Sequence, residues 1–184
     1  LNEYLAREAN KEDQCSGRFW EGRFKSQALL DEAGLLTCMA YVDLNPIRAS
    51  IANSPEDSDF TSIQKRIRSL NKKPATPSHL KAFHIPHQND DDQTIPFGLH
   101  DYLELVDWSG RVIREGKRGA IAATLPPILT RLNIEADIWK KMMQPNGNLF
   151  KQAIGRIDSL RLYAERQNKQ WCQGMQTSSA LFPT

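Results

Sequence analysis

The sequence is poor in cysteine, in long apolar runs and in excess charge of either sign. Its three cysteines, Cys15, Cys38 and Cys172, lie far apart and form no CxxC pair, so neither a disulfide framework nor a zinc knuckle is indicated. No stretch approaches the roughly 18 apolar residues that span a membrane, and the polar first residues do not resemble a signal peptide. We therefore expect a cytoplasmic protein with reduced thiols and no membrane contact.

The net charge does not indicate a binding partner, because the 24 Lys and Arg residues nearly balance the 22 Asp and Glu residues. The distribution is more informative than the sum. Between Phe60 and Asn89 there are six basic residues and no acidic one. Such a stretch favours contact with a DNA backbone, and the alternative is a solvated helix face followed by a linker. The six basic residues are Lys65, Arg66, Arg68, Lys72, Lys73 and Lys81.

Hydrophobic spacing predicts a mainly α fold, with at most one or two short strands. A short strand is expected over Arg23–Leu30. Asp31 is a suitable N-cap for the helix that follows, at about residues 31–44, which must end before Asn45-Pro46 because a residue before proline avoids the α region. Pro46 then begins a new turn. Further helices are expected at residues 1–11, 61–70, 99–106, 127–132, 136–143 and 149–170, with Ser109 capping a separate turn.

Composition divides the chain near its middle. Residues 73–96 are rich in proline and carry the acidic run Asp90–Asp92, so we expect a flexible linker between segments 1–72 and 97–184. The last nine residues are expected to be frayed. Three of the tryptophans are assigned to the core: Trp108, Trp139 and Trp171.

Cations alternate with aromatic residues between residues 18 and 25. This mixture suits single-stranded nucleic acid, because cations bind phosphates while aromatic faces stack on bases. The alternative is that the aromatic side chains belong to the core and the cations are solvated flanks. The cations are Arg18, Arg23 and Lys25, and the aromatic residues are Phe19, Trp20 and Phe24.

Tyr41 and Asn45 lie four residues apart across a helix end and therefore face the same side. A tyrosine hydroxyl is a nucleophile when a cation or a metal stabilises its phenolate. An asparagine oxygen is a suitable ligand for Mg²⁺ or Mn²⁺. The alternative is that Tyr41, between Met39 and Leu44, is simply packed.

The segment GRFWEGRFKSQALLDE, followed by YVDLNPIRA, closely resembles the C-terminal half of the REP-associated tyrosine transposases, which are relatives of the HUH single-strand transposases. The resemblance rests on a G-x-x-W-E-G-R-F/Y-K-S block placed about fifteen residues before a Y-x-x-x-N-P-x-R-A block. Residues 101–111 and 117–129 resemble an extension carried by a longer branch of that family. The fold implied is a helical remnant of an α+β (ferredoxin-like) transposase domain plus a helical C-terminal extension of unknown role.

The resemblance implies cleavage and rejoining of single-stranded DNA beside a hairpin, through a 5′-phosphotyrosine link. Tyr41 matches the nucleophile, and Asn45 matches the third ligand of a Mg²⁺ or Mn²⁺ ion. Arg48, in the same block, is assigned to DNA binding. The family's two metal histidines form a His-hydrophobic-His strand before the tyrosine, but no histidine precedes residue 79 here, and the His84–His87 pair does not fit that motif.

The metal site is therefore expected to be incomplete in this chain. For lack of those histidines we expect the chain to be inactive by itself. Leucine rather than methionine at residue 1 favours a piece of a longer protein, and the alternative is a chain from a decayed element. A second hypothesis is a non-catalytic DNA-binding or regulatory module derived from a transposase. A third is a helical protein-interaction domain that ignores nucleic acid. The sequence sets no oligomeric state.

Overall fold

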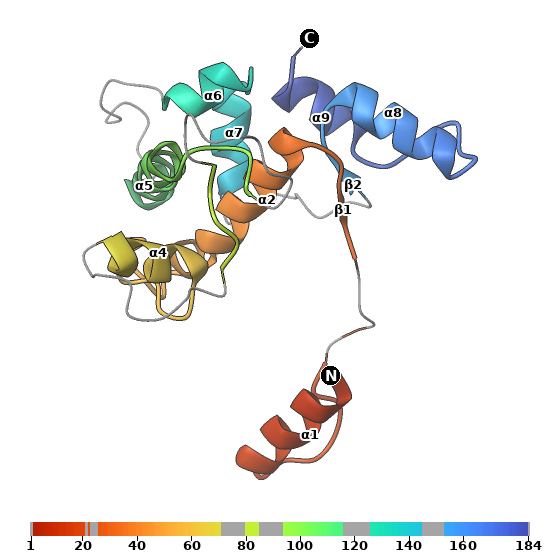
Figure 1. Cartoon of the computed structure of the whole chain (residues 1–184). Coiled ribbons are helices and arrows are strands. Elements are labelled where there is room, and N and C mark those ends of the chain that lie inside the picture. Colours follow the sequence, from red (N-terminus) through yellow and green to blue (C-terminus); the bar gives the residue numbers. More distant parts are fainter. Residues whose placement is uncertain are drawn as a thin grey trace.

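A computed structural model describes residues 2–20, 22, 26–70, 80–84, 94–115, 126–144 and 153–183. The described chain is mainly α-helical with two very short strands, which confirms the predicted fold class (Figure 1). The elements are α1 (Asn2–Glu12), β1 (Ala28–Leu29), α2 (Glu32–Asp43), α3 (Asn45–Arg48), α4 (Ser62–Leu70), α5 (Leu99–Glu115), α6 (Pro127–Arg131), α7 (Ala136–Met143), β2 (Ala153–Ile154), α8 (Ile157–Arg166) and α9 (Met175–Leu181).

Helix α2 begins and ends where the sequence predicts. The Asp31 carboxylate accepts a hydrogen bond from Gly34 N at 2.8 Å, which satisfies one first-turn amide. At the other end Pro46 occupies the first turn of α3. Three residues of this segment, Leu36, Ala40 and Leu44, are completely buried. The helix therefore lies in the core along most of its length.

The predicted helix over residues 149–170 is wrong in its first part. Ala153 and Ile154 form β2, which pairs in parallel with β1, and α8 begins only at Ile157. Gly155 explains the change, since a Cβ there would lie 2.7 Å from Asp31 Oδ2. Asp31 also accepts a hydrogen bond from Arg156 N at 2.7 Å. One carboxylate thus joins the starts of two helices that are distant in sequence. The predicted strand over Arg23–Leu30 is reduced to β1 among its described residues.

Helix α5 runs without interruption through the core. The sequence predicted a helix ending at Val106 and a separate turn capped by Ser109, but α5 continues to Glu115. Ser109 is buried and its Oγ accepts a hydrogen bond from Trp139 Nε1 at 3.0 Å, instead of capping a helix. Trp108 and Trp139 are core residues, as predicted, whereas Trp171 is 61% exposed and that assignment is wrong.

The C-terminal tail is ordered rather than frayed. Residues 175–181 form α9, in which Ser178 and Leu181 are buried, and Phe182 after it is buried as well. The Ser178 hydroxyl donates to Gly155 O at 2.6 Å, which joins α9 to the turn after β2. One hydrophobic cluster includes side chains from α2 to α7 and from α9. The expected segments 1–72 and 97–184 therefore share a core, while the division at 73–96 stays a prediction.

Helix α1 stands apart from the other helices (Figure 1) and has no buried residue. The chain returns along it, because Trp20 Nε1 donates a hydrogen bond to Asn2 O at 2.9 Å. The Phe19 and Trp20 rings meet edge to face and remain 42% and 44% exposed. Their interpretation as core residues is wrong, and Phe24 lies outside the described residues. None of the described helices is both long enough and apolar enough to cross a membrane.

Candidate functional site

Tyr41 is held by Arg48, two helical turns further along the chain. Arg48 Nη2 donates a hydrogen bond to Tyr41 Oη at 2.5 Å, and the Arg48 guanidinium carbon lies 3.6 Å from the centre of the tyrosine ring. This contact forms because α3 continues almost directly from α2: Leu44, between them, has helical dihedral angles. Tyr41 and Arg48 are both half-buried. The phenol oxygen of a half-buried tyrosine thus lies against a fixed positive charge.

The arrangement has a chemical consequence for the tyrosine oxygen. A guanidinium at hydrogen-bond distance stabilises negative charge as it develops on that oxygen. It also restricts the ring to one orientation, since the cation covers one ring face. The assignment of Arg48 to DNA binding stays a prediction, and the structure places its guanidinium on Tyr41. The signal was present in the seven-residue spacing, which puts both side chains on one side of a continuous helix.

Asn45 is the first residue of α3, and its side chain is exposed. In the described part of the chain, no group of three or more His, Cys, Asp or Glu side chains is placed to hold a metal ion. The nearest carboxylate in sequence, Asp43, is 2% exposed and has other partners. The donors present therefore do not fit a complete centre for Mg²⁺ or Mn²⁺, and Asn45 offers a single amide oxygen.

Asp43 is a structural residue that the sequence analysis missed. Its carboxylate accepts hydrogen bonds from Ser62 Oγ at 2.8 Å, from Ile63 N at 3.2 Å and from Tyr102 Oη at 2.6 Å. Burial and the adjacent Asp43 charge together raise the pKa of Tyr102 well above its ordinary value. The available signal was an acidic residue at the end of a helix that is largely apolar after its first turn. Asp43 joins α2 to the start of α4 and to α5, and so fixes the helix that carries Tyr41.

The predicted DNA-binding residues that the structure describes differ in their exposure and in their partners. Arg18 is exposed beside Phe19 and Trp20, and Lys65 is exposed on α4. Arg68 forms an ion pair with Asp59 at 3.5 Å. Arg66 is directed elsewhere, with Nη2 donating to Lys81 O at 3.0 Å. The remaining predicted residues, Arg23, Lys25, Lys72 and Lys73, lie outside the described residues.

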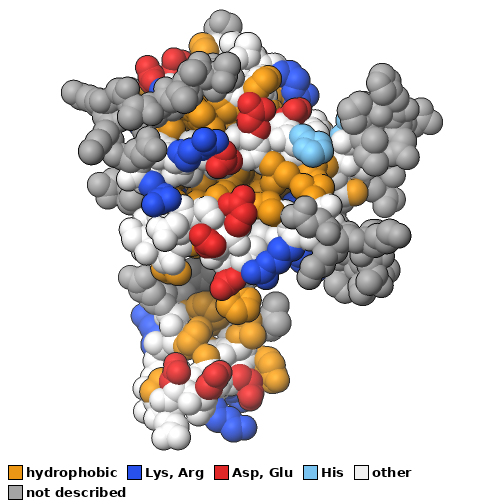
Figure 2. Space-filling view, turned by 90° about the vertical axis from the view of Figure 1, so that its left-hand side faces the viewer, with side chains coloured by type: hydrophobic (Ala, Val, Ile, Leu, Met, Phe, Trp, Pro, Cys, Tyr) orange, Lys and Arg blue, Asp and Glu red, His pale blue; other side chains and the backbone are white. Residues whose placement is uncertain are grey.

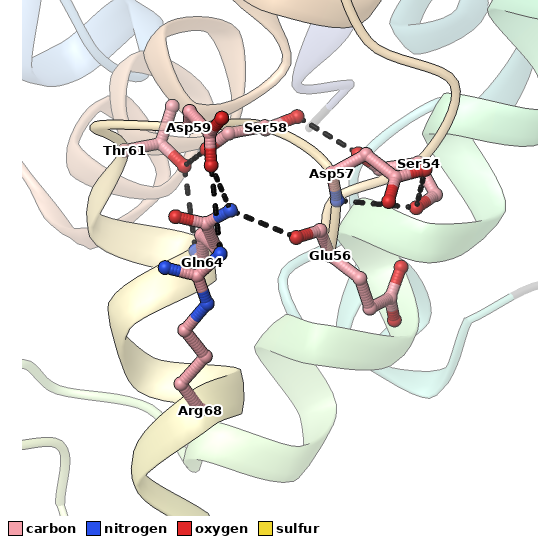
Figure 3. Close-up of polar contacts among 8 residues, drawn as sticks. All are labelled: Ser54, Glu56, Asp57, Ser58, Asp59, Thr61, Gln64 and Arg68. Atoms are coloured by element: carbon pink, nitrogen blue, oxygen red, sulfur yellow. Dashed lines mark hydrogen bonds and ion pairs between the residues drawn. The ribbon is translucent and has the colours of Figure 1, made fainter.

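The loop before α4 is held by many polar contacts (Figure 3). Gln64 Nε2 donates to Glu56 O at 2.9 Å and to Asp59 Oδ1 at 2.6 Å. Thr61 Oγ1 accepts a hydrogen bond from Gln64 N at 3.3 Å, as expected of a helix cap. Within this loop Phe60 is fully exposed and has a φ of 62°, a region that bulky side chains avoid.

Charge on the face drawn in Figure 2 is mixed, with acidic and basic side chains interspersed among hydrophobic ones. The loop contributes the Asp59 carboxylate, which pairs with Arg68 of α4. This ion pair offsets one of the cations in the basic stretch that begins at residue 60. Comparison of the chain with protein-family models, with curated proteins and with solved structures finds no match.

Proposed function

We propose that this chain is the nucleophile-bearing part of a DNA transposase that cleaves and rejoins single-stranded DNA at hairpin sequences. The observation that carries the proposal is the hydrogen bond from Arg48 to the Tyr41 hydroxyl. It supplies the cation that a tyrosine nucleophile requires, at a site that solvent reaches. The resemblance of the segments around Tyr41 and Asn45 to REP-associated tyrosine transposases supports the same function.

The chain's own residues account for the covalent step. Tyr41 Oη attacks the phosphorus of a DNA phosphodiester, forming a bond from tyrosine oxygen to phosphorus while the bond from phosphorus to the 3′ oxygen breaks. The tyrosine proton passes to water, and the departing 3′ oxygen takes up a proton. Arg48 stabilises the negative charge that develops on Oη as the proton leaves, and keeps the ring in place. Rejoining is the reverse step, in which a 3′ hydroxyl displaces Tyr41, so the covalent link preserves the bond energy.

The metal expected for such an enzyme enters no step here, because the described donors do not fit a complete site. The reading frame upstream of Leu1 is a direct test of the proposal. A His-hydrophobic-His strand encoded there is the expected result. An upstream frame that lacks such a strand would contradict the assignment to this class of enzyme.

The decisive biochemical test is a covalent DNA adduct. A labelled hairpin oligonucleotide with a single-stranded flank is incubated with the longer protein and Mg²⁺ or Mn²⁺, then resolved under denaturing conditions. We expect an adduct from the parent protein, none from Tyr41→Phe, and a normal amount from Tyr4→Phe. Tyr4 is the matched control because it is 65% exposed and lies on α1. An undiminished adduct with Tyr41→Phe would refute the role of Tyr41.

The second candidate function is a DNA-binding or regulatory module without catalysis. The observation that favours it is the lack of a fitting metal group among the described residues. It predicts salt-dependent binding of hairpin DNA that is unchanged in Tyr41→Phe, together with no adduct from any form of the protein. A chain that binds no hairpin DNA at low salt would remove both candidates and leave a helical protein-interaction domain.

A further inference from the structure

A cavity of about 630 Å³ lies between α4, the segment 80–84 and the first turn of α5. Its volume falls within the range of roughly 300–1,000 Å³ that is usual for small-ligand sites. Neither Tyr41 nor Asn45 belongs to its lining. The cavity is therefore a separate feature that the proposed function leaves unexplained.

The walls of the cavity are mostly apolar, with ionisable groups at defined places. Leu80, Ala82, Phe83 and Leu99 supply hydrophobic surface. His84 and His100 also line it, and they are the two histidines among the described residues. In Figure 2 a histidine borders hydrophobic side chains on the exposed face. The cavity thus combines apolar contact area with flat imidazole rings.

Positive charge enters the cavity from α4. Lys65 and Arg66 line it, against a single lining carboxylate, Asp101, among the described residues. The amides of the first turn of α5 add partial positive charge, since Gly98, Leu99 and His100 lie at the start of this 17-residue helix. The lining is therefore electrostatically suited to an anionic group beside an apolar one.

Arg66 is positioned firmly and has hydrogen-bonding capacity to spare. Its guanidinium carbon lies 4.4 Å from the centre of the Phe83 ring, and Nη2 donates to Lys81 O. Its Nε is buried and has no hydrogen-bond partner among the described residues. Burial lowers the pKa of Arg66, and the nearby Asp43 carboxylate opposes that shift. A desolvated cation of this kind gains more than a solvated one from an anionic partner.

We propose that this cavity binds a nucleotide, with the phosphate at Lys65 and Arg66 and the base against the apolar wall and the histidines. A phosphate matches the planar donor array of arginine and the point charge of lysine. A flat base matches imidazole, arginine and aliphatic surfaces, on which bases stack. The nucleotide belongs either to a single DNA strand or to a free mononucleotide. Because Tyr41 and Asn45 lie outside the cavity, this inference goes beyond the proposed function.

The test is calorimetric titration of the chain with 2′-deoxyadenosine 5′-monophosphate at low salt. We expect saturable binding that weakens as salt is raised. Deoxyadenosine, which lacks the phosphate, and deoxyribose 5-phosphate, which lacks the base, should each bind at least about tenfold more weakly. Absence of saturable binding of the nucleotide would overturn the inference. Equal binding of deoxyribose 5-phosphate and the nucleotide would overturn the assignment of the base to the apolar wall.

Matched variants locate the ligand. Arg66→Gln removes a lining cation, and we expect roughly 10- to 100-fold weaker binding from the loss of a charge-assisted hydrogen bond. Arg68→Gln changes the charge of the same helix equally, but Arg68 does not line the cavity, so binding should be unchanged. Equal effects of the two substitutions would refute the site.

A third variant tests the site independently, in case Arg66→Gln does not fold. Ala82→Trp fills the cavity from an exposed lining position and removes no charge. We expect it to abolish nucleotide binding while the helical circular dichroism is retained. Unchanged binding in a folded Ala82→Trp variant would place the ligand elsewhere and overturn the inference.

Competition identifies the source of the nucleotide. If the cavity takes a nucleotide of a DNA strand, Ala82→Trp weakens binding of a single-stranded oligodeoxyadenylate, and the mononucleotide displaces that oligomer from the unaltered chain. If it takes a free mononucleotide, neither Ala82→Trp nor added mononucleotide changes the binding of the oligomer. Tyr41→Phe should leave mononucleotide binding unchanged in either case. A failure of the covalent adduct test therefore leaves this inference standing, and the converse is also true.

Discussion

Tyr41 on α2 and Tyr102, which reaches α2 from α5, differ in the group that binds their hydroxyl oxygen. Tyr41 is half-buried, and its oxygen accepts a hydrogen bond from the Arg48 cation. Tyr102 is completely buried, and its hydroxyl donates to the Asp43 carboxylate. Burial and the Asp43 carboxylate raise the pKa of Tyr102 and keep its hydroxyl neutral, whereas the partner of the Tyr41 hydroxyl is a cation. The Tyr102 hydroxyl therefore serves structural support, whereas the Tyr41 hydroxyl has the kind of partner that the proposed nucleophile requires.

The largest expected effect comes from removing the carboxylate on the structural side. Asp43→Ala leaves Tyr102 Oη, Ser62 Oγ and Ile63 N without their common acceptor. Since each buried group left unsatisfied costs about 1–3 kcal/mol, we expect the free energy of unfolding to fall by about 3 kcal/mol or more. Urea unfolding followed by circular dichroism measures this. Asp137→Ala is the control, because its carboxylate is exposed in the first turn of α7 and forms a surface ion pair with Lys140.

The next largest effect tests the hydroxyl on Tyr102. Tyr102→Phe removes one charge-assisted hydrogen bond to Asp43 but keeps the ring, so we expect a loss of about 2 kcal/mol. The ring remains packed between Phe83 and Phe97 in the aromatic cluster. A variant as stable as the unaltered chain would mean that the Asp43 contact contributes nothing.

The same variant gives a pH dependence with a definite sign. Burial, followed by the Asp43 charge, raises the pKa of Tyr102 well above its ordinary value of about 10. In the unfolded chain the hydroxyl loses its proton above pH of about 10, whereas the folded chain retains it, so stability falls as pH rises beyond that point. Tyr102→Phe should remove up to about 1.4 kcal/mol per pH unit of this decline. The free energy of unfolding of both chains is measured from about pH 9.5 to about pH 11. Identical slopes against pH in the unaltered chain and Tyr102→Phe would contradict the assignment.

The comparison also predicts which substitution harms chemistry but spares the fold. Arg48→Gln removes the cation from Tyr41, and we expect the rate of covalent adduct formation in the longer protein to fall about tenfold or more. Arg48→Lys should restore part of that rate, because the positive charge returns without the planar stacking. Equal rates in the glutamine and lysine variants would show that charge at this position does not serve the tyrosine.

Local sequence signals predicted the helix that carries Tyr41, but tertiary contacts decided its surroundings. Asp31 as a cap and Pro46 as a break both act within a few residues, so α2 and α3 were predictable. Gly155 and the β1–β2 pair depend on an approach to Asp31 from more than a hundred residues away. The periodic apolar residues around 149–170 therefore suggested a helix where a strand and a turn occur.

The candidate site was predictable to the same partial extent. Tyr41 and Asn45 followed from their spacing and from the family resemblance, and the structure retains them at one helix junction. Arg48 was assigned to DNA binding from its place in the resemblance block, and the seven-residue spacing that brings it onto Tyr41 was overlooked because Pro46 was expected to interrupt the helix. Arg66 was likewise assigned to DNA binding, with a solvated helix face as the alternative, whereas its guanidinium contacts the Phe83 ring and Lys81 O. In both cases the partner is set by packing rather than by the charge pattern.

The smallest expected change in stability, that of Tyr41→Phe, tests the difference between the two tyrosines most directly. Tyr41→Phe removes a hydroxyl whose hydrogen bond is partly solvated, and the phenylalanine ring can still lie under Arg48. We therefore expect the free energy of unfolding to change by less than about 1 kcal/mol, well below the loss from Tyr102→Phe. Urea unfolding of the two variants in parallel measures the difference. A loss at Tyr41 equal to that at Tyr102 would mean that both hydroxyls are structural, and the case for Tyr41 as a nucleophile would then rest on the resemblance alone.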